Sequence, residues 1–438
     1  MNKFNQFLEA KLLPIATKLG TNKGLVAIRD GVTMSIPLLI IGSLFMIIAS
    51  LPFPGWEAWL GEIGVSGYLW KGVNSSFGLM GLVASFGVAY SFAKQYKVDG
   101  ISAGIISLSS FIIVTPFIAS EAGEGISVSY MGSQGLFVAI VLGLISAYIF
   151  QIFINKNIQI KLPDTVPPAV SRSFSALIPG TVIITLWLII FIIIDKTSFG
   201  NLHQVLIIVL GKPLSIFTSN ILGTIVAIIL NSLFWFVGLH GGNVVNTIFK
   251  PLWLMNSDAN RLAFQSGLEI PNIITLEFMD NFVYMGGGGA TLGLVIVVAL
   301  IAMKKKSSSM TKTMAPLTLT PGIFNINEPT MYGLPIVFNI SLIIPFILAP
   351  VVNAVITYLA MDFGLVAKTV GISVSWTMPP IISGYLATGN HISGAIIQVI
   401  CIIVDILIYY GFYKTVEKQN LILEGKIEAK KEKKSMVK

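Results

Sequence analysis

The stretch GIFNINEPTMYG, from Gly322 to Gly333, interrupts a sequence that is otherwise apolar over membrane-spanning lengths. Glu328 lies inside it, and a carboxylate at membrane depth costs about 2.5–3.5 kcal/mol or more unless it faces a polar cavity or a partner. Four residues here disfavour a continuous helix: Pro321, Gly322, Pro329 and Gly333. Broken backbone is tolerated in a bilayer only where protein or a water-filled cavity satisfies its hydrogen-bonding groups. The stretch is therefore predicted to form a re-entrant hairpin that lines a substrate chamber.

Composition places the chain in a membrane. The mean hydropathy is +0.84, with 54% apolar and 11% charged residues, whereas soluble domains contain about 25% charged residues. The net charge of +8 does not indicate a nucleic-acid partner, because the lysines gather at the termini and in short loops. Cys401 is the only cysteine, so the chain can form no internal disulfide and contains no C-x-x-C site. We expect a polytopic membrane protein with no metal site and no cofactor.

Apolar segments of about 20 residues predict the membrane spans. A first group is expected at 31–51, 73–93, 100–118, 135–154 and 175–194, and a second group at 219–239, 286–303, 334–360 and 392–414. Between the groups, apolar residues at helical spacing are interrupted by four residues, which indicates an interfacial helix: His203, Gln204, Lys212 and Pro213. A similar pattern from Phe4 to Leu19 predicts another interfacial helix, or alternatively a helix that binds a soluble partner.

These segments predict an all-α polytopic membrane protein with about ten transmembrane helices, two re-entrant hairpins and interfacial amphipathic helices. The expected organisation is an N-terminal half at 1–200, an amphipathic connector at 201–218, a C-terminal half at 219–414 and a charged tail at 415–438.

Loop charges predict the orientation. Lysines follow the second, fourth and seventh spans and fill the C-terminal tail, which places these loops and both termini in the cytoplasm. Two regions resist assignment. The polar region 240–285 must still carry the chain across the membrane, as a broken helix, unless one of the assigned spans is wrong. Region 364–391 contains Pro379, Pro380, Gly384 and Gly389 in an otherwise apolar stretch.

A second polar constellation, WFVGLHGGN, runs from Trp235 to Asn243 at the end of a predicted span. His240 lies beside two glycines, which allow a ligand to approach the backbone closely. A neutral imidazole can donate at one nitrogen and accept at the other, which matches a sugar hydroxyl; the alternative is a helix-end histidine bonded to a carbonyl. Trp235 could stack on the apolar face of a sugar, or could belong to an interfacial tryptophan belt.

The four glycines from Gly286 to Gly289 open the predicted span at 286–303. Such a run favours close helix packing over phosphate binding.

At these motifs the chain resembles the membrane-embedded sugar permease, enzyme IIC, of the bacterial phosphotransferase system, in its lactose, cellobiose and diacetylchitobiose branch. The resemblance rests on the run from Arg29 to Thr33 leading into Pro37, and on the runs 235–240, 321–339 and 376–380. It implies a homodimer whose first half forms the dimer interface, and whose second half carries the sugar in a chamber between two hairpins.

The resemblance also implies the site residues. His240 and Glu328 would contact the sugar near its reacting 6-hydroxyl and act as the catalytic pair. Further sugar contacts would come from Trp235, Asn243, Asn327 and Trp376. The phosphoryl donor would be a separate enzyme IIB, since the tail contains no phosphorylatable cysteine. No role is carried over to His391.

The leading hypothesis is therefore group translocation of a β-linked disaccharide of the cellobiose or diacetylchitobiose type. The partners would be the sugar, phosphorylated enzyme IIB, membrane lipid and a second copy of the chain. The alternative is an ion-coupled secondary transporter, which would also use broken helices and a buried acid.

Overall fold

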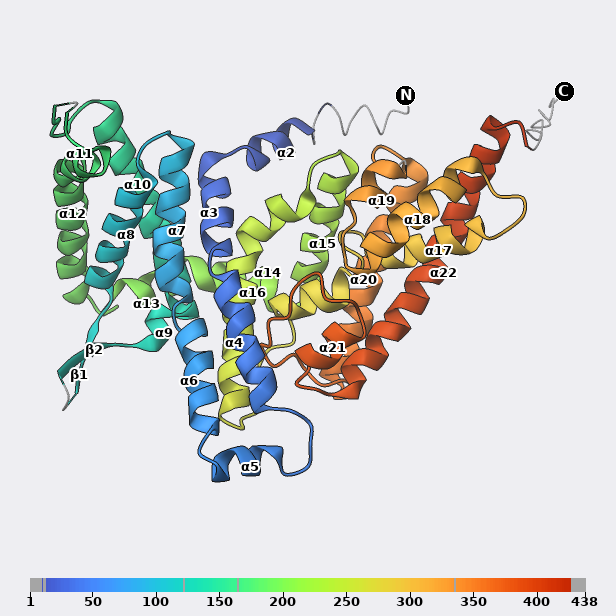
Figure 1. Ribbon diagram of the computed structural model, residues 1–438, viewed down its shortest axis with the longest axis horizontal. Helices are drawn as coiled ribbons and strands as arrows, with labels where there is room; N and C mark the ends of the chain where they lie inside the picture. Colours follow the sequence, from blue (N-terminus) through green and yellow to red (C-terminus); the bar gives the residue numbers. More distant parts are fainter. Residues whose placement is uncertain (1–9, 11–12, 121–122, 164, 335, 427–438) are drawn as a thin grey trace.

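The computed structural model describes residues 10, 13–120, 123–163, 165–334 and 336–426. It is built of helices, with one small antiparallel hairpin of strands β1 (Phe117–Ser120) and β2 (Gly123–Ile126). The helices form two groups that lie side by side, and the chain enters the second group only after completing most of the first (Figure 1). The prediction of an all-α fold is confirmed except at this hairpin.

Six helical stretches in the described part of the chain are long and apolar enough to cross a membrane, or seven if one bent pair counts as a span. They are Lys23–Ala49, Ser66–Gln95, Ser133–Asn155, Pro168–Asp195, Ser341–Asp362 and Ile392–Leu423, and the bent pair is Leu202–Ile216 with Ile221–Phe236. The chain is thus a multi-pass membrane protein. Length and composition support fewer crossings than the predicted number of about ten.

The first half packs around α7. Its helices are α2 (Leu13–Gly20), α3 (Lys23–Thr33), α4 (Ile36–Ala49), α5 (Trp56–Glu62), α6 (Ser66–Phe77), α7 (Met80–Gln95), α8 (Gly100–Val114), α9 (Val128–Met131), η2 (Ser133–Gly135), α10 (Leu136–Asn155), α11 (Pro168–Ser175) and α12 (Leu177–Asp195). A Cβ on Gly31 would lie 2.3 Å from the backbone nitrogen of Val88, so only glycine lets α3 approach α7 this closely. Of the predicted N-terminal amphipathic helix, residues 1–9 and 11–12 lie outside the described residues.

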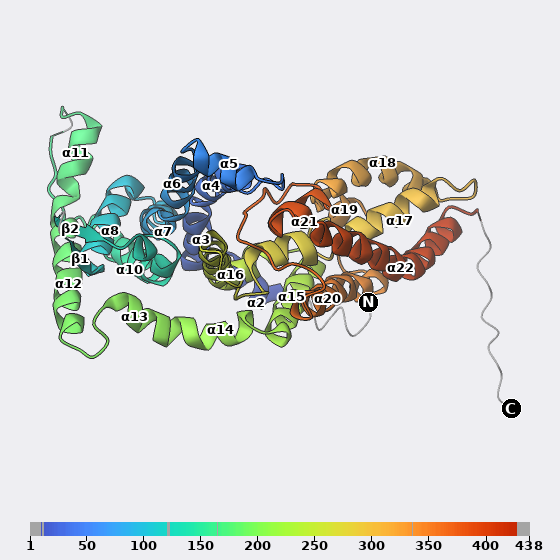
Figure 2. The same cartoon turned by 90° about the horizontal axis from the view of Figure 1, so that it is seen from below.

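The connector is helical throughout. It comprises α13 (Leu202–Leu206), the π-helical turn η3 (Ile207–Gly211) and α14 (Lys212–Thr218). Figure 2 shows it running along one side of the molecule from α12 to α15. Pro213 does not interrupt it, because proline is tolerated in the first turn of a helix. His203 is fully buried and lies 3.0 Å from the hydroxyl of Thr115, so it anchors the connector to the first half.

The second half contains shorter and more broken elements. They are α15 (Ile221–Phe236), α16 (Gly241–Gln265), η4 (Phe278–Val283), α17 (Leu292–Ala302), α18 (Ser309–Ile323), α19 (Glu328–Gly333), α20 (Ile340–Asp362), α21 (Ile382–Ala387) and α22 (Ile392–Leu423). Figure 1 shows α17 to α22 gathered together, with α15 and α16 between them and the first half.

Several predicted spans have wrong bounds. The span at 100–118 ends as a helix at Val114, because Pro116 disfavours the helical conformation of the residue before it. The span at 286–303 begins only at Leu292, since the glycines before it form a loop. The spans at 334–360 and 392–414 correspond to helices Ile340–Asp362 and Ile392–Leu423.

The extension of α22 beyond the predicted span has a structural role. Buried Glu417 accepts a hydrogen bond from the backbone nitrogen of Ser308 at 2.5 Å, and Glu424 accepts one from that of Ser309 at 2.8 Å. Both carboxylates thereby satisfy free N–H groups at the start of α18. The hydrogen bond from Lys426, together with those from the backbone nitrogens of Ser309 and Met310, lowers the pKa of Glu424 to about 2.

The unassigned polar region 240–285 contains α16, a continuous helix of 25 residues. Such a helix is about 37 Å long, enough to cross a bilayer. Two of its three charged residues are paired with one another, because Arg261 Nε lies 2.7 Å from Asp258 Oδ1 and both side chains are buried. Asp258 also accepts a hydrogen bond from Ser133, and Arg261 donates one to Asn74. Residues of the first half therefore complete the polar environment of α16.

Candidate functional site

The polar stretch singled out in the sequence forms a break between two helices. Helix α18 continues through Pro321 and Gly322 to Ile323, further than predicted, and α19 begins at Glu328. Between them Asn325 adopts a left-handed conformation with φ +61°. The break places the carboxylate of Glu328 at the N-terminus of α19, where the helix dipole favours a negative charge.

Two asparagines of this break hold neighbouring loops. Asn325 accepts a hydrogen bond from the backbone nitrogen of Gly286 at 2.7 Å and donates to the carbonyl of Trp376 at 2.8 Å. Asn327 is 4% exposed and donates to the carbonyl of Gly288 at 3.0 Å. A Cβ on Gly287, whose φ is +93°, would lie 2.7 Å from the side chain of Asn327. The glycine run thus packs against the polar break, and the prediction that it opens a helix is wrong.

His240 caps the start of α16. Its Nδ1 accepts a hydrogen bond from the backbone nitrogen of Asn243 at 3.2 Å. In the neutral imidazole the proton must then lie on Nε2. The sequence-based alternative of a helix-end histidine is confirmed in its position, but the bonding partner is a backbone N–H and not the expected carbonyl. Only Nε2 is left for a ligand, so the dual donor and acceptor role expected from the sequence reduces to donation.

The imidazole and the carboxylate of the two motifs face one another. His240 Nε2 lies 3.9 Å from Glu328 Oε1, and their side chains are 44% and 48% exposed. The distance is too long for a direct hydrogen bond. One hydroxyl oxygen could therefore bind both groups, accepting from Nε2 and donating to the carboxylate.

These groups line a cavity of about 300 Å³. Three side-chain oxygens on its wall are buried: Asn246 Oδ1 has no hydrogen-bond partner within the described residues, and Asn231 Oδ1 and the hydroxyl of Tyr284 have no partner there beyond one another. Buried polar atoms in proteins are nearly always paired. Buried oxygens with so few partners on the wall of one cavity therefore indicate a polar occupant.

A second cavity of about 290 Å³ adjoins the first between α3 and α16. The two share Gly242, Asn246, Lys250 and Trp376 on their walls. Arg29 and Asp30 line the second cavity and form an ion pair of 2.7 Å. The run from Arg29 to Thr33, noted in the sequence, thus belongs to the site although it lies in the first half.

The remaining predicted site residues occupy different positions around these cavities. Trp235 is 2% exposed and packs on the imidazole of His240, with 4.3 Å between ring centroids, so it does not belong to a lipid-facing belt. Trp376 is 54% exposed and lines both cavities. Asn243 lines only the second cavity. His391, to which no role was given, lines neither cavity.

Sequence reasoning missed several residues on the wall of the first cavity. Asn246 and Lys250 lie at helical spacing from Asn243, a pattern that predicts one polar face once α16 is known to be continuous. Asp280 and Tyr284 are four residues apart in the π-helical segment η4 and just after it. No residue pattern in this loop-rich region would have placed them at the cavity.

Comparisons with known proteins agree with this geometry. A family model described as phosphotransferase system, EIIC, matches residues 29–350. The lichenan permease IIC component of Bacillus subtilis (strain 168) is 46% identical over 98% of this chain and 97% of its own length. The cellobiose-specific EIIC component of Geobacillus stearothermophilus is 46% identical over 96% of this chain and 95% of its own length.

A solved structure has the same fold. The transporter ChbC, the IIC component from the N,N'-diacetylchitobiose-specific phosphotransferase system, is 42% identical and superposes with a TM-score of 0.90. The match covers 96% of this chain and 99% of that chain. Together with the matched family model, these relatives show that the chain belongs to the EIIC family of the phosphotransferase system, in its lactose, cellobiose and chitobiose branch.

Proposed function

We propose that this permease binds a β-linked disaccharide of the cellobiose or diacetylchitobiose type and presents its 6-hydroxyl for phosphorylation by a separate enzyme IIB. Family membership implies a sugar substrate and an EIIB partner. The relatives named for lichenan, cellobiose and diacetylchitobiose support the β-linked class. The observation that carries the proposal is the pair of His240 Nε2 and Glu328 Oε1, 3.9 Å apart on the wall of a cavity with buried polar oxygens.

The chemistry follows from the different roles of the two side chains. Nε2 of His240 donates to the 6-oxygen and orients it, while the carboxylate of Glu328 accepts the hydrogen of the same hydroxyl. When the oxygen attacks the phosphoryl group of a phosphocysteine on enzyme IIB, the new P–O bond replaces the P–S bond. The hydroxyl proton passes to Glu328, which acts as general base. The charged product cannot leave through the apolar part of the membrane, so phosphorylation traps it.

The two adjoining cavities suggest how the disaccharide lies. The ring that carries the reacting hydroxyl occupies the cavity of His240 and Glu328. The other ring occupies the cavity between α3 and α16, where Asn243 and the ion pair of Arg29 and Asp30 offer hydrogen bonds to its hydroxyls. Trp376 borders both cavities and can pack on the sugar between them. Trp235 packs against the imidazole of His240 and supports its position. Asn327 holds the glycine loop through the carbonyl of Gly288.

The architecture proposed with this function keeps the two halves. Residues 1–200 form the dimer interface, 201–218 the connector, 219–414 the sugar-carrying half, and 415–438 a cytoplasmic tail. The shorter apolar helices α8 and α17 and the polar α16 add crossings to the longer spans, giving about ten with two re-entrant hairpins. Both termini lie in the cytoplasm of a bacterial cell.

Uptake by reconstituted vesicles tests the proposal. With the cognate phosphorylated enzyme IIB inside, labelled cellobiose, diacetylchitobiose and lactose should compete for uptake, and the product should be a sugar 6-phosphate. Collapse of ion gradients should leave uptake unchanged. Uptake of unmodified sugar that depends on an ion gradient would contradict group translocation and support the secondary transporter instead.

A further inference from the structure

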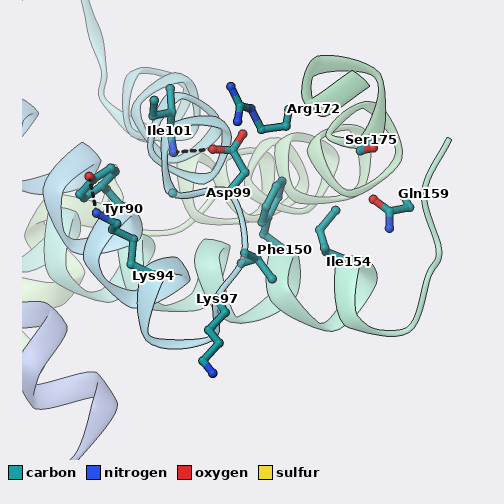
Figure 3. A pocket seen from close by; sticks show the side chains of 12 residues that line it. Tyr90, Lys94, Lys97, Asp99, Ile101, Phe150, Ile154, Gln159, Arg172 and Ser175 are labelled. Carbon is teal, nitrogen blue, oxygen red and sulfur yellow. Dashed lines mark hydrogen bonds between the residues drawn. The ribbon is translucent and has the colours of Figure 1, made fainter. Parts of the chain in front are cut away.

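A basic cavity of about 490 Å³ lies far from the sugar site, among the ends of α7, α8, α10 and α11 (Figure 3). Lys94 and Arg172 are among its lining residues, and the side chain of Lys97 points away from the others. Asp99 is the only carboxylate on its wall, and it already caps α8 through the backbone nitrogen of Ile101 at 3.1 Å. The cations of Lys94 and Arg172 therefore exceed the single carboxylate, and the cavity attracts anions.

The cations are available to a ligand. Arg172 and Lys97 are exposed, and their side chains make no hydrogen bond or ion pair with the residues that the structure describes. Lys94 donates only to the hydroxyl of Tyr90, a neutral group, at 2.9 Å. A planar guanidinium is suited to bind two oxygens of a phosphate, and an ammonium binds such an anion as a point charge. A phosphate group fits this arrangement.

Apolar side chains continue from the cavity toward the membrane. Phe150 and Ile154 of α10 form part of its wall. Ile101 belongs to the wall as well, and Ile105 follows one helical turn further along α8; they are 57% and 55% exposed. The cavity lies at the lysine-rich end of the first half, which is predicted to face the cytoplasm. Basic pockets between helices on that side of a membrane bind anionic lipid headgroups.

We propose that this cavity binds the phosphate of an anionic phospholipid from the cytoplasmic leaflet, with an acyl chain along the exposed isoleucines of α8. Charge complementarity selects the phosphate, and the continuous apolar surface selects a lipid over a soluble anion. The site is separate from the sugar cavities and does not depend on the proposed substrate.

Binding of fluorescent phosphatidylglycerol to the purified full-length protein in detergent tests the proposal. Unlabelled phosphatidylglycerol should displace the probe, whereas phosphatidylcholine, inorganic phosphate and glycerol 3-phosphate should displace it at least tenfold less effectively. Lys94→Gln and Arg172→Gln should each weaken binding about fivefold, and the double variant about 25-fold. Lys305→Gln, which removes one exposed cation from the turn after α17, is the matched control and should change binding less than twofold.

Two further measurements keep the result interpretable. Sugar binding by the double variant should match the wild type, which shows that it is folded. Ile101→Gln should weaken lipid binding and leave binding of inorganic phosphate unchanged. Equal displacement by phosphatidylcholine, or an equal loss with Lys305→Gln, would overturn the proposal. Equal displacement by inorganic phosphate would assign the cavity to a soluble anion instead of a lipid.

Discussion

The carboxylate of Glu328 has no hydrogen bond to the described residues, and the imidazole Nε2 of His240 lies 3.9 Å from it. We expect Glu328→Gln to weaken sugar binding roughly 10- to 150-fold, because a hydrogen bond to a charged group contributes about 1.5–3 kcal/mol. Phosphorylation should fall further, since the amide cannot accept the proton. Calorimetric binding and product formation measure the two effects. Glu269→Gln, at an exposed loop position, is the control; if both variants bind alike and dimerise, Glu328 lies outside the site.

The two nitrogens of His240 allow capping and binding to be separated. Asparagine is a good N-cap, so His240→Asn should keep α16 capped while losing the Nε2 donor. We expect its thermal stability to stay near that of the wild type and its sugar affinity to fall about 2- to 12-fold, for a hydrogen bond of about 0.5–1.5 kcal/mol.

His240→Ala should lose affinity and, in addition, about 0.5–2 kcal/mol of stability with the cap. Leu239→Ala provides a packing change at the same depth. Parallel losses of affinity and melting temperature in all three variants would show that His240 acts only through the structure.

At the residue scale, the sequence pointed to Glu328 and His240 because polar residues stand out in apolar surroundings. It could not show which nitrogen of His240 is free, since that depends on the backbone geometry of Asn243. Lys250 and Asp280 were overlooked for the opposite reason. They lie in a region where polar residues are common, so no single one is conspicuous.

Among the elements, the loop before α17 depends on glycine for two separate reasons. Gly287 combines φ +93° with a Cβ position 2.7 Å from Asn327, whereas Gly267 has φ +65° and open space around it. Gly287→Ala should therefore lower both thermal stability and sugar affinity, because it displaces Asn327 beneath the site. Gly267→Ala carries only the backbone strain and should leave sugar affinity unchanged. Equal sugar affinities for the two variants would separate the glycine loop from the binding site.

Helix bounds were the least predictable part of the elements. Apolar periodicity located the long helices of the first half. It does not reveal that glycines adopt positive φ angles, so the predicted start of α17 at Gly286 precedes its actual start at Leu292. Helix α16 was expected to be broken, because charged residues such as Asp258 and Arg261 interrupt the apolar pattern, whereas it is continuous. Their pairing with each other and with the first half exists only in the folded protein.

On the scale of the whole molecule, hydrogen bonds link the segment 364–391, which includes α21, to the first half. Asn390 donates to the carbonyl of Ser50 at 2.7 Å, and Ser43 accepts from the backbone nitrogen of Ser373 at 2.8 Å. If the second half moves to carry the sugar across, these bonds must break. We expect Ser50→Cys with Asn390→Cys, on a Cys401→Ser background and joined by a cleavable thiol crosslinker, to stop uptake until the linker is cut.

The control for this prediction is a crosslink within the second half, between Lys304→Cys and Tyr410→Cys, whose wild-type side chains lie 3.4 Å apart. It should not affect uptake. Undiminished uptake by the crosslinked pair of Ser50 and Asn390 would confine the motion to the hairpins. Helix α3 lines a sugar cavity with residues of α16, and Asn390 binds Ser50. Both contacts join residues that are far apart in the sequence, so the sequence alone could not predict them.

The ion pair within α16 also constrains how the protein is made. A lone charged residue at the centre of a helix costs about 2.5–3.5 kcal/mol when the translocon passes it into the lipid. Asp258 and Arg261 of α16 are paired with one another, and their further partners Ser133 and Asn74 leave the ribosome before α16 does. During biosynthesis the first half can thus already be in the membrane, with the donor hydroxyl of Ser133 and the acceptor oxygen of Asn74 in place, when α16 emerges. If α16 crosses the membrane, as proposed above, the order of residues along the chain lets its two paired charges meet their polar partners as soon as the helix is made.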